Sequence, residues 1–349
     1  MSDAARAIDG RGAGGAAGSA PGGTSSAPGD LGASAGRGGD RPRTPHDGRF
    51  APSPSGPLHV GNLRTALLAW LFARVAGGRF LVRIEDLDQQ RSRPEHEAAQ
   101  LADLAALGLD WDGPPVRQSE RHDRHREALE QLRAAGRVYP CWCTRAEIRE
   151  AASAAHGPLP EGAYPGTCRR LTAAERAERA ASGRPPALRL DARGERIAFE
   201  DRIHGRVERA VDDFVLWRGD GTPAYNLAVV VDDSDQGIRE IVRGDDLLDS
   251  TPRQILLARL LGLPTPSYAH VPLVLGPDGR RLAKRHGAVT LRDLAATRGW
   301  TTARALGWMA HSLGLASAEE AARGALTPAA LLERFDPARL PREPATFAP

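Results

Sequence analysis

The feature that most constrains the fold is a short apolar segment that passes through a Pro- and Gly-rich turn into a long apolar run. The turn spans residues 49–62 (RFAPSPSGPLHVGN) and ends in a His-x-Gly-Asn box. Residues 63–75 then repeat apolar side chains at helical spacing, and Gly77 with Gly78 would end a helix there. Free backbone N–H groups at a helix start favour anions. The stretch therefore predicts a phosphate site, although similar turns with one histidine also occur without a catalytic role.

A second strand and helix follow at once. Residues 80–84 (FLVRI) read as a buried strand with Glu85 at its end, and Pro94 opens a helix that reaches about Leu107. This alternation predicts an α/β fold with a parallel sheet, in which ligands bind beyond the carboxyl ends of the strands. Arg49 and Glu85 would both lie at that edge.

The middle of the chain has a different pattern. Residues 119–135 read as an amphipathic helix. Residues 186–233 alternate apolar and polar positions between Gly-rich turns, which predicts a β-rich region that includes residues 225–231. Acidic pairs such as Asp232 and Asp233 are more often found in solvated turns than in sites.

The three cysteines form the candidate metal centre. Cys141, Cys143 and Cys168 are clustered in a chain without the features of a secreted protein, which favours a metal over disulfides. Zinc takes four ligands, most often thiolates and imidazoles, so His156 is the usual chemical choice for the fourth and Tyr164 an unusual one. The alternative is three reduced structural thiols.

A basic segment follows a tight turn late in the chain. Residues 280–287 (RRLAKRHG) fit either a surface loop or a cationic clamp for a polyphosphate. Short amphipathic helices are expected after it.

Composition limits the kinds of protein and partner that remain possible. Residues 1–46 contain Gly, Ala, Ser, Pro and Arg with almost no large apolar side chain, so we expect a disordered tail. The formal charge of +3 and the pI near 9.0 permit a polyanionic partner. No apolar run reaches the ~18 residues of a membrane span, and the start lacks the pattern of a signal peptide. We therefore expect a cytoplasmic monomer without membrane contact.

With the box at residues 59–62 and the basic segment at residues 280–287, the chain resembles the class I aminoacyl-tRNA synthetases of the glutamyl/glutaminyl branch. The resemblance covers about residues 49–340. The box at residues 59–62 resembles the first ATP signature of this family, and RLAKR at 281–285 resembles the second. Residues 49–54, 83–86, 225–233 and 242–248 also match the branch. Asn62, Arg281, Ala283 and Arg285 depart from the usual residues of the two signatures.

The resemblance implies a Rossmann-like catalytic domain with a parallel sheet, an inserted zinc-bearing and β-rich region that contacts tRNA, and a short helical C-terminal part. The expected layout is a tail at 1–46, the first half of the catalytic domain at 47–138, the zinc insertion at 139–185, the connecting region and second half at 186–260, and the second ATP loop with the helical end at 261–349.

The resemblance also implies the roles of individual residues. His59 and Lys284 would be catalytic. ATP would be bound by His59, Gly61, Asn62, Arg281 and Lys284, with Mg²⁺ accompanying the nucleotide. Glutamate would be bound by Arg49, Ser53, Glu85, Tyr225 and Arg243, although an arginine paired to a nearby Asp or a tyrosine filling the core is common without a ligand. One structural zinc would be held by Cys141, Cys143, Tyr164 and Cys168, with His156 the minor alternative.

Within the branch, the short remainder after Lys284 leaves no room for a large anticodon-binding region. The chain therefore resembles the shortened members that activate glutamate without tRNA and join it to queuosine in the anticodon loop of tRNA(Asp). The alternatives are a truncated glutamyl-tRNA synthetase that charges a tRNA 3′ end, and a catalytically silent, zinc-bearing RNA-binding paralogue.

Overall fold

The computed structural model describes residues 46–144, 146–148 and 163–348. The predicted tail therefore lies outside the described residues except for its last position, and so does His156. Among the helices that are described, none combines the length and the apolar character needed to cross a membrane.

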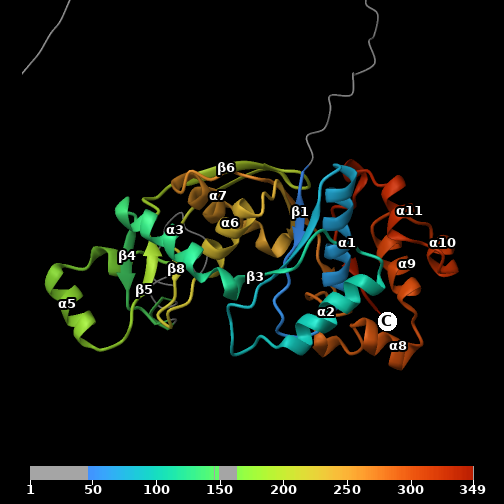
Figure 1. Ribbon diagram of the computed structural model, residues 1–349, viewed down its shortest axis with the longest axis horizontal. Coiled ribbons are helices and arrows are strands. Elements are labelled where there is room, and N and C mark those ends of the chain that lie inside the picture. The colour runs from blue at the N-terminus through green and yellow to red at the C-terminus, as the bar shows by residue number, and fades with distance from the viewer. Residues whose placement is uncertain (1–45, 145, 149–162, 349) are drawn as a thin grey trace, which may run out of the picture. The chain divides into compact units, whose positions relative to one another are not determined.

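The described chain is organised around a seven-stranded sheet in the order β3-β2-β1-β9-β10-β6-β7 (Figure 1). Neighbouring strands are parallel from β3 to β6, and β7 is antiparallel to β6. The predicted α/β class with a parallel sheet is confirmed. The strands are β1 (Gly48–Phe50), β2 (Phe80–Ile84), β3 (Val116–Arg117), β6 (Arg196–Asp201), β7 (Gly205–Ala210), β9 (Glu240–Gly244) and β10 (Ser267–Val271).

Helices cover both faces of this sheet, because successive strand side chains point to opposite sides. In β2, Leu81 packs with the cluster that contains α3, α6 and α7, whereas Val82 packs with the cluster around α1. The helices of this region are α1 (Val60–Val75), α2 (Pro94–Ala106), η1 (Gln118–Arg121), α3 (His122–Ala134), α6 (Tyr225–Asp235), η3 (Asp245–Ser250) and α7 (Thr251–Leu260). The predicted first two helices are thus confirmed.

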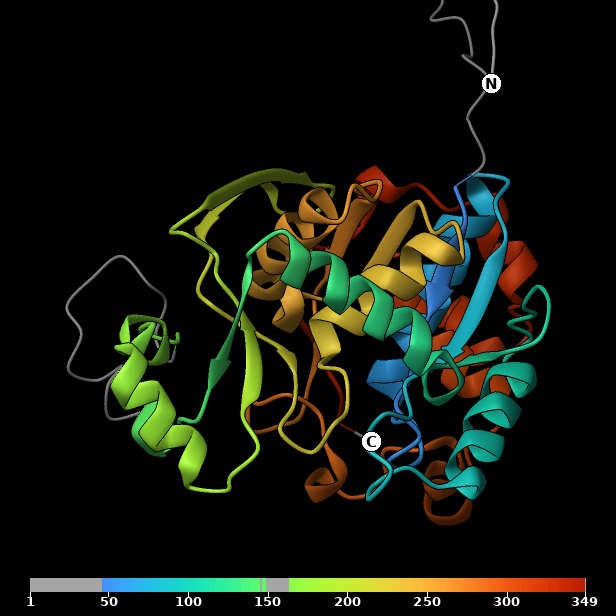
Figure 2. The same ribbon diagram turned by 60° about the vertical axis from the view of Figure 1, so that its left-hand side comes forward.

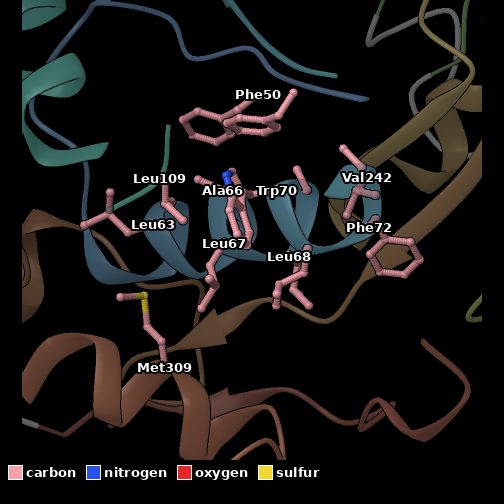
Figure 3. Packing of buried hydrophobic residues seen from close by; sticks show 14 of the residues in the cluster. Phe50, Leu63, Ala66, Leu67, Leu68, Trp70, Phe72, Leu109, Val242 and Met309 are labelled. Carbon is pink, nitrogen blue, oxygen red and sulfur yellow. The ribbon is translucent and has the colours of Figure 1, made fainter. Parts of the chain in front are cut away.

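Helix α1 is the centre of the larger core. Phe50 lies on one side of it and Met309 on the other, and Leu67 is fully buried between the sheet and the C-terminal helices (Figure 3). The run ends where the glycines predicted it, since Gly77 adopts a φ of 68° that other residues rarely take. Burial of this helix fixes its first turn, and with it the box at residues 59–62.

A second, three-stranded antiparallel sheet carries the cysteines. It consists of β4 (Val138–Cys141), β5 (Ala187–Leu190) and β8 (Val215–Trp217), in that order. Figure 1 and Figure 2 both show this sheet and α5 (Ala173–Ala181) at the end of the described structure that is far from α1. The short turn η2 (Thr167–Arg170) packs beside β4.

The C-terminal part is helical. It comprises β11 (Val274–Leu275), η4 (Lys284–His286), α8 (Leu291–Arg298), α9 (Thr302–Ser312), α10 (Ala318–Arg323), α11 (Pro328–Glu333), η5 (Pro337–Arg339) and β12 (Ala345–Thr346). Strand β11 pairs in parallel with β12. This part packs α9 and α11 against α1.

One sequence prediction was wrong. Residues 225–231 form the first part of helix α6 rather than a strand. The reason is that α6 is buried on nearly all sides from Leu227 to Asp233, so its apolar residues show neither a helical nor a strand period, while its consecutive valines favour a strand locally. Asp232 and Asp233 are consequently buried helical residues and not parts of a solvated turn.

Candidate active site

A cavity of about 750 Å³ opens at the carboxyl ends of β1, β2 and β9. Nine of the residues predicted for ATP and glutamate line it, although they come from segments far apart in the sequence. They are Arg49, Ser53, His59, Gly61, Asn62, Glu85, Tyr225, Arg243 and Arg281. The position agrees with the general rule for ligands of parallel sheets.

The box at residues 59–62 closes the first turn of α1. His59 is the N-cap: its Nδ1 accepts a hydrogen bond from the Asn62 backbone N–H at 3.2 Å, and the Asn62 side-chain oxygen accepts one from the His59 N–H at 3.3 Å. This reciprocal pair is a capping box. The asparagine that departs from the family signature therefore helps to set the start of the helix.

Gly61 is required by close packing. A Cβ atom at this position would lie 3.0 Å from His59 Nδ1 and 3.2 Å from Val274 Cβ. A larger residue would push the His59 ring away from its cap. The glycine thus protects the geometry of His59, in addition to any room it leaves for a nucleotide.

His59 is neutral with its proton on Nε2. Burial, with a smaller contribution from the Arg281 charge, lowers the pKa of His59 from 6.5 to about 4. Because Nδ1 accepts the Asn62 N–H, the ring proton of the neutral imidazole must be on Nε2. His59 therefore supplies the cavity with an uncharged hydrogen-bond donor.

A buried ion-pair cluster forms the floor near Glu85. Asp233 Oδ1 accepts from Arg49 Nε at 3.0 Å and from Arg83 Nη1 at 2.6 Å. Arg83 Nη2 in turn lies 3.2 Å from Glu85 Oε1. The expected alternative for Arg49, a pairing with a nearby Asp, thus exists, and Arg49 lines the cavity at the same time.

The two carboxylates of this cluster respond differently to burial. Burial raises the pKa of Glu85, against the opposing effect of Arg83 and Arg49. Burial also disfavours the charged form of Asp233, but Arg49 and Arg83 outweigh it and hold the pKa of Asp233 below its usual value. Asp233 is the firmly ionised partner of the two arginines, which leaves Glu85 as the carboxylate that faces the cavity.

Arg243 is held on three sides. Its Nη2 donates to Thr251 Oγ1 at 2.7 Å, its Nε donates to His270 Nε2 at 3.1 Å, and its Nη1 lies 3.4 Å from the Tyr225 hydroxyl. Tyr225 begins α6 and remains 37% exposed, so its ring forms part of the cavity wall. The guanidinium therefore has a fixed orientation.

Arg281 is the residue of the second signature that lines the cavity in the described part of the structure. Arg281 forms an ion pair with Asp246, which also lines the cavity. Lys284 opens the short turn η4, and its side chain lies outside the described part of the structure. Its predicted role stays a prediction.

The sequence led us to interpret Asp233 as part of a solvated turn, and it indicated no role for Thr251 or His270. Asp233 is 184 positions from Arg49, and the partners of Arg243 on other elements, Thr251 and His270, have no local motif. The one available signal was two acidic residues inside an otherwise apolar run, which is unusual in a buried helix.

The cysteines come together in a buried cluster at the end of β4. The three sulfur atoms lie within 4.8 Å of one another, and Cys143 Sγ is 3.4 Å from Cys168 Sγ. The Tyr164 hydroxyl lies 3.4 Å from Cys141 Sγ and 3.5 Å from Cys143 Sγ. Three thiols and one phenol oxygen therefore converge, which is a donor set that fits a four-coordinate metal.

Known proteins resemble this chain in sequence and in fold. Residues 47–323 match the family described as "tRNA synthetases class I (E and Q), catalytic domain". The chain belongs to this family. It is 62% identical over 299 residues to the glutamyl-Q tRNA(Asp) synthetase of Nocardia farcinica, covering 85% of this chain and 91% of that protein.

Two further class I synthetases agree with the assignment. The glutamyl-Q tRNA(Asp) synthetase of Symbiobacterium thermophilum is 55% identical over 309 residues, which cover 85% of this chain and 94% of that protein. The crystal structure of a glutamate tRNA ligase from Elizabethkingia meningosepticum in complex with its amino acid superposes with a TM-score of 0.73 at 29% identity, over 87% of this chain and 67% of that one. The expectation of a class I ligase is confirmed.

Proposed function

We propose that this class I synthetase activates L-glutamate with ATP, without needing tRNA, and transfers it to queuosine in the anticodon loop of tRNA(Asp). The observation that carries the activation step is that one cavity combines the capped start of α1 with Glu85 and with Arg49 and Arg243, which are both held by hydrogen bonds. The acceptor is suggested by the glutamyl-Q tRNA(Asp) synthetases, which share 62% and 55% of their aligned residues with this chain.

In the first step, a glutamate α-carboxylate oxygen attacks the α-phosphorus of ATP. A phosphorus–oxygen bond forms to the carboxylate while the bond to pyrophosphate breaks, which gives glutamyl-adenylate. A carboxylate nucleophile has no proton to lose, so the protein aligns the reactants and stabilises charge. We assign His59 Nε2–H, the start of α1, Arg281 and Lys284 to the phosphates, and Gly61 and Asn62 to the geometry of that end of the cavity.

Glutamate has one ammonium and two carboxylates. Glu85 is the proposed partner of the ammonium, because it is a carboxylate that lines the cavity, whereas Asp233 is already bound by Arg49 and Arg83. Arg49 and Arg243 are the proposed partners of the carboxylates, with hydroxyls from Ser53 and Tyr225 completing the site.

In the second step, a hydroxyl of the queuosine cyclopentene ring attacks the activated carbonyl. An ester forms, AMP leaves, and the hydroxyl proton is released. The anticodon loop must then reach the same cavity. Helix α5 has no buried residue and lies in Figure 1 at the same end of the described structure as β4, which ends at Cys141, so we propose this end as a tRNA contact.

We assign one structural zinc to Cys141, Cys143, Cys168 and Tyr164. His156, which lies outside the described residues, remains the alternative to Tyr164. Such a metal would tie β4 to the segment that includes η2. Mg²⁺ is expected to enter with ATP and to bind mainly through phosphate and water. Metal analysis of reduced, untagged protein should find about one zinc, and a protein free of zinc would contradict this part of the proposal.

ATP–pyrophosphate exchange tests the activation. Wild-type protein should exchange label with L-glutamate and no tRNA, and should not do so with L-aspartate, which has one methylene fewer between its two carboxylates. A strict requirement for tRNA would favour an ordinary glutamyl-tRNA synthetase. Absence of exchange with and without tRNA would favour the silent RNA-binding paralogue.

A further inference from the structure

A row of buried polar side chains crosses three neighbouring strands behind the glutamate end of the cavity. Arg243 on β9 is the register partner of His270 on β10, and β6, which ends in Asp201, lies on the other side of β10. His270 has no exposed surface and Asp201 is 3% exposed. A fully buried row of this kind is costly unless each polar group is satisfied.

The hydrogen bonds fix where each proton is. Arg243 Nε always carries a proton and donates it to His270 Nε2 at 3.1 Å. Nε2 must therefore present a lone pair. The remaining ring proton of neutral His270 is then on Nδ1, which lies 2.6 Å from Asp201 Oδ2.

Asp201 is anchored independently of His270's ring. Its Oδ1 accepts the backbone N–H groups of Ile203 and His204 at 2.9 and 3.0 Å, in the turn between β6 and β7. Both carboxylate oxygens also lie within 3.3 Å of the His270 backbone N–H. Because both oxygens face donors, the position requires a carboxylate.

We infer that Asp201 and His270 are positioning residues for the glutamate site: Asp201 holds His270 in the Nδ1–H form, so that His270 Nε2 can orient the guanidinium of Arg243 toward the amino acid. This inference rests on the proposed function, because it requires that Arg243 binds glutamate. It adds two residues that touch neither substrate.

The burial of the row supports the neutral form of His270. Burial is the main cause that lowers the pKa of His270, and the Arg243 charge adds to it, while the Asp201 bond opposes it. A doubly protonated ring would place an Nε2–H against the Arg243 Nε–H. Thr251 completes the arrangement, since its hydroxyl lies 2.9 Å from His270 Nε2 and also accepts from Arg243 Nη2.

Three substitutions separate the bond between Asp201 and His270 from the bond between His270 and Arg243. In Asp201→Asn the amide oxygen should face the two backbone N–H groups of the turn, so the N–H₂ faces His270 Nδ1 and the ring gains by moving its proton to Nε2. His270→Asn keeps a donor near Asp201 but is too short to accept from Arg243. His270→Gln instead can reach the position of Nε2 and should restore the bond to Arg243.

The test is the KM for glutamate in tRNA-independent exchange, compared with the KM for ATP. Asp201→Asn and His270→Asn should raise the glutamate KM about tenfold or more, as expected for one lost hydrogen bond to a buried charge, and leave the ATP KM within about twofold. His270→Gln should recover most of the glutamate affinity.

A matched control is His125→Asn. His125 is also fully buried and bonds an aspartate, Asp232, at 2.9 Å, but it lies on α3 and does not line the cavity. It should lower the thermal stability without a selective change in the glutamate KM. If Asp201→Asn and His270→Asn behave like this control, the positioning role is wrong.

A spectroscopic measurement tests the position of the His270 ring proton independently of enzymatic activity. In ¹⁵N-histidine spectra of the wild-type protein, His270 should carry its proton on Nδ1, and Asp201→Asn should shift it to Nε2. A wild-type proton on Nε2 would overturn this inference whether or not the enzyme is active. Wild-type protein that shows this proton on Nδ1 but fails to activate glutamate would instead overturn the proposed function.

Discussion

The strongest structural prediction concerns Asp233→Asn. The wild-type carboxylate accepts from two buried guanidinium groups, and the side chains of Arg49 and Arg83 are 5% and 0% exposed. Removing one partner of a buried ion pair costs about 3–5 kcal/mol. The amide oxygen of Asn can still accept from one arginine, so we expect about 3 kcal/mol, the lower end of that range.

Thermal unfolding measures this cost. At roughly 2 °C per kcal/mol for a chain of this size, the Tm at pH 7 should fall by about 6 °C. Asp103→Asn is the matched control, because burial alone raises the pKa of Asp103 to about 6 and no ion pair holds it in the described chain. Its charge is unfavourable at pH 7, so the control should not lower the Tm.

The pH dependence gives a second test of the same reasoning. The pKa of Asp233 is lower in the folded protein than its ordinary value of 3.8, so its contribution is complete above about pH 4 and is lost as the pH falls through the folded pKa. The difference between wild type and Asp233→Asn should therefore shrink toward pH 3. An equal Tm for both proteins at pH 7, or a gap that widens in acid, would refute the account of this cluster.

Three further predictions concern the ATP end of the cavity. Gly61→Ala should displace the His59 ring and lower kcat/KM for ATP about tenfold or more, as overpacking by one methyl costs about 1–3 kcal/mol; an unchanged value would show that the ring is free to move. In an NMR titration of the free enzyme, His59 should protonate near pH 4, and a midpoint near 6.5 would contradict its burial. Lys284→Ala should slow activation by about 2.7–4 kcal/mol, and unchanged exchange would remove its assigned role.

The sequence correctly predicted those helices and strands whose caps, periodicity and turn residues all lie within a short stretch. The turn at residues 49–62, the strand at 80–84 and the two helices that follow them were correct because caps, periodicity and turn residues lie side by side in the sequence. The wrong strand at 225–231 arose because burial on all sides of α6 removes the helical period. Side-chain partners were not predictable, since Asp233 reaches the arginines only through the packing of α6 on the sheet, and His270 reaches Arg243 only because β10 pairs with β9.

We propose above that the activated glutamate goes to the modified anticodon base and not to the tRNA 3′ end. The most direct test uses tRNA(Asp) whose 3′-terminal adenosine has been removed, with and without queuosine, incubated with the protein, ATP and labelled glutamate. Label should enter the shortened tRNA only when queuosine is present. Labelling of intact tRNA that is lost with the terminal adenosine, and that does not depend on queuosine, would contradict it.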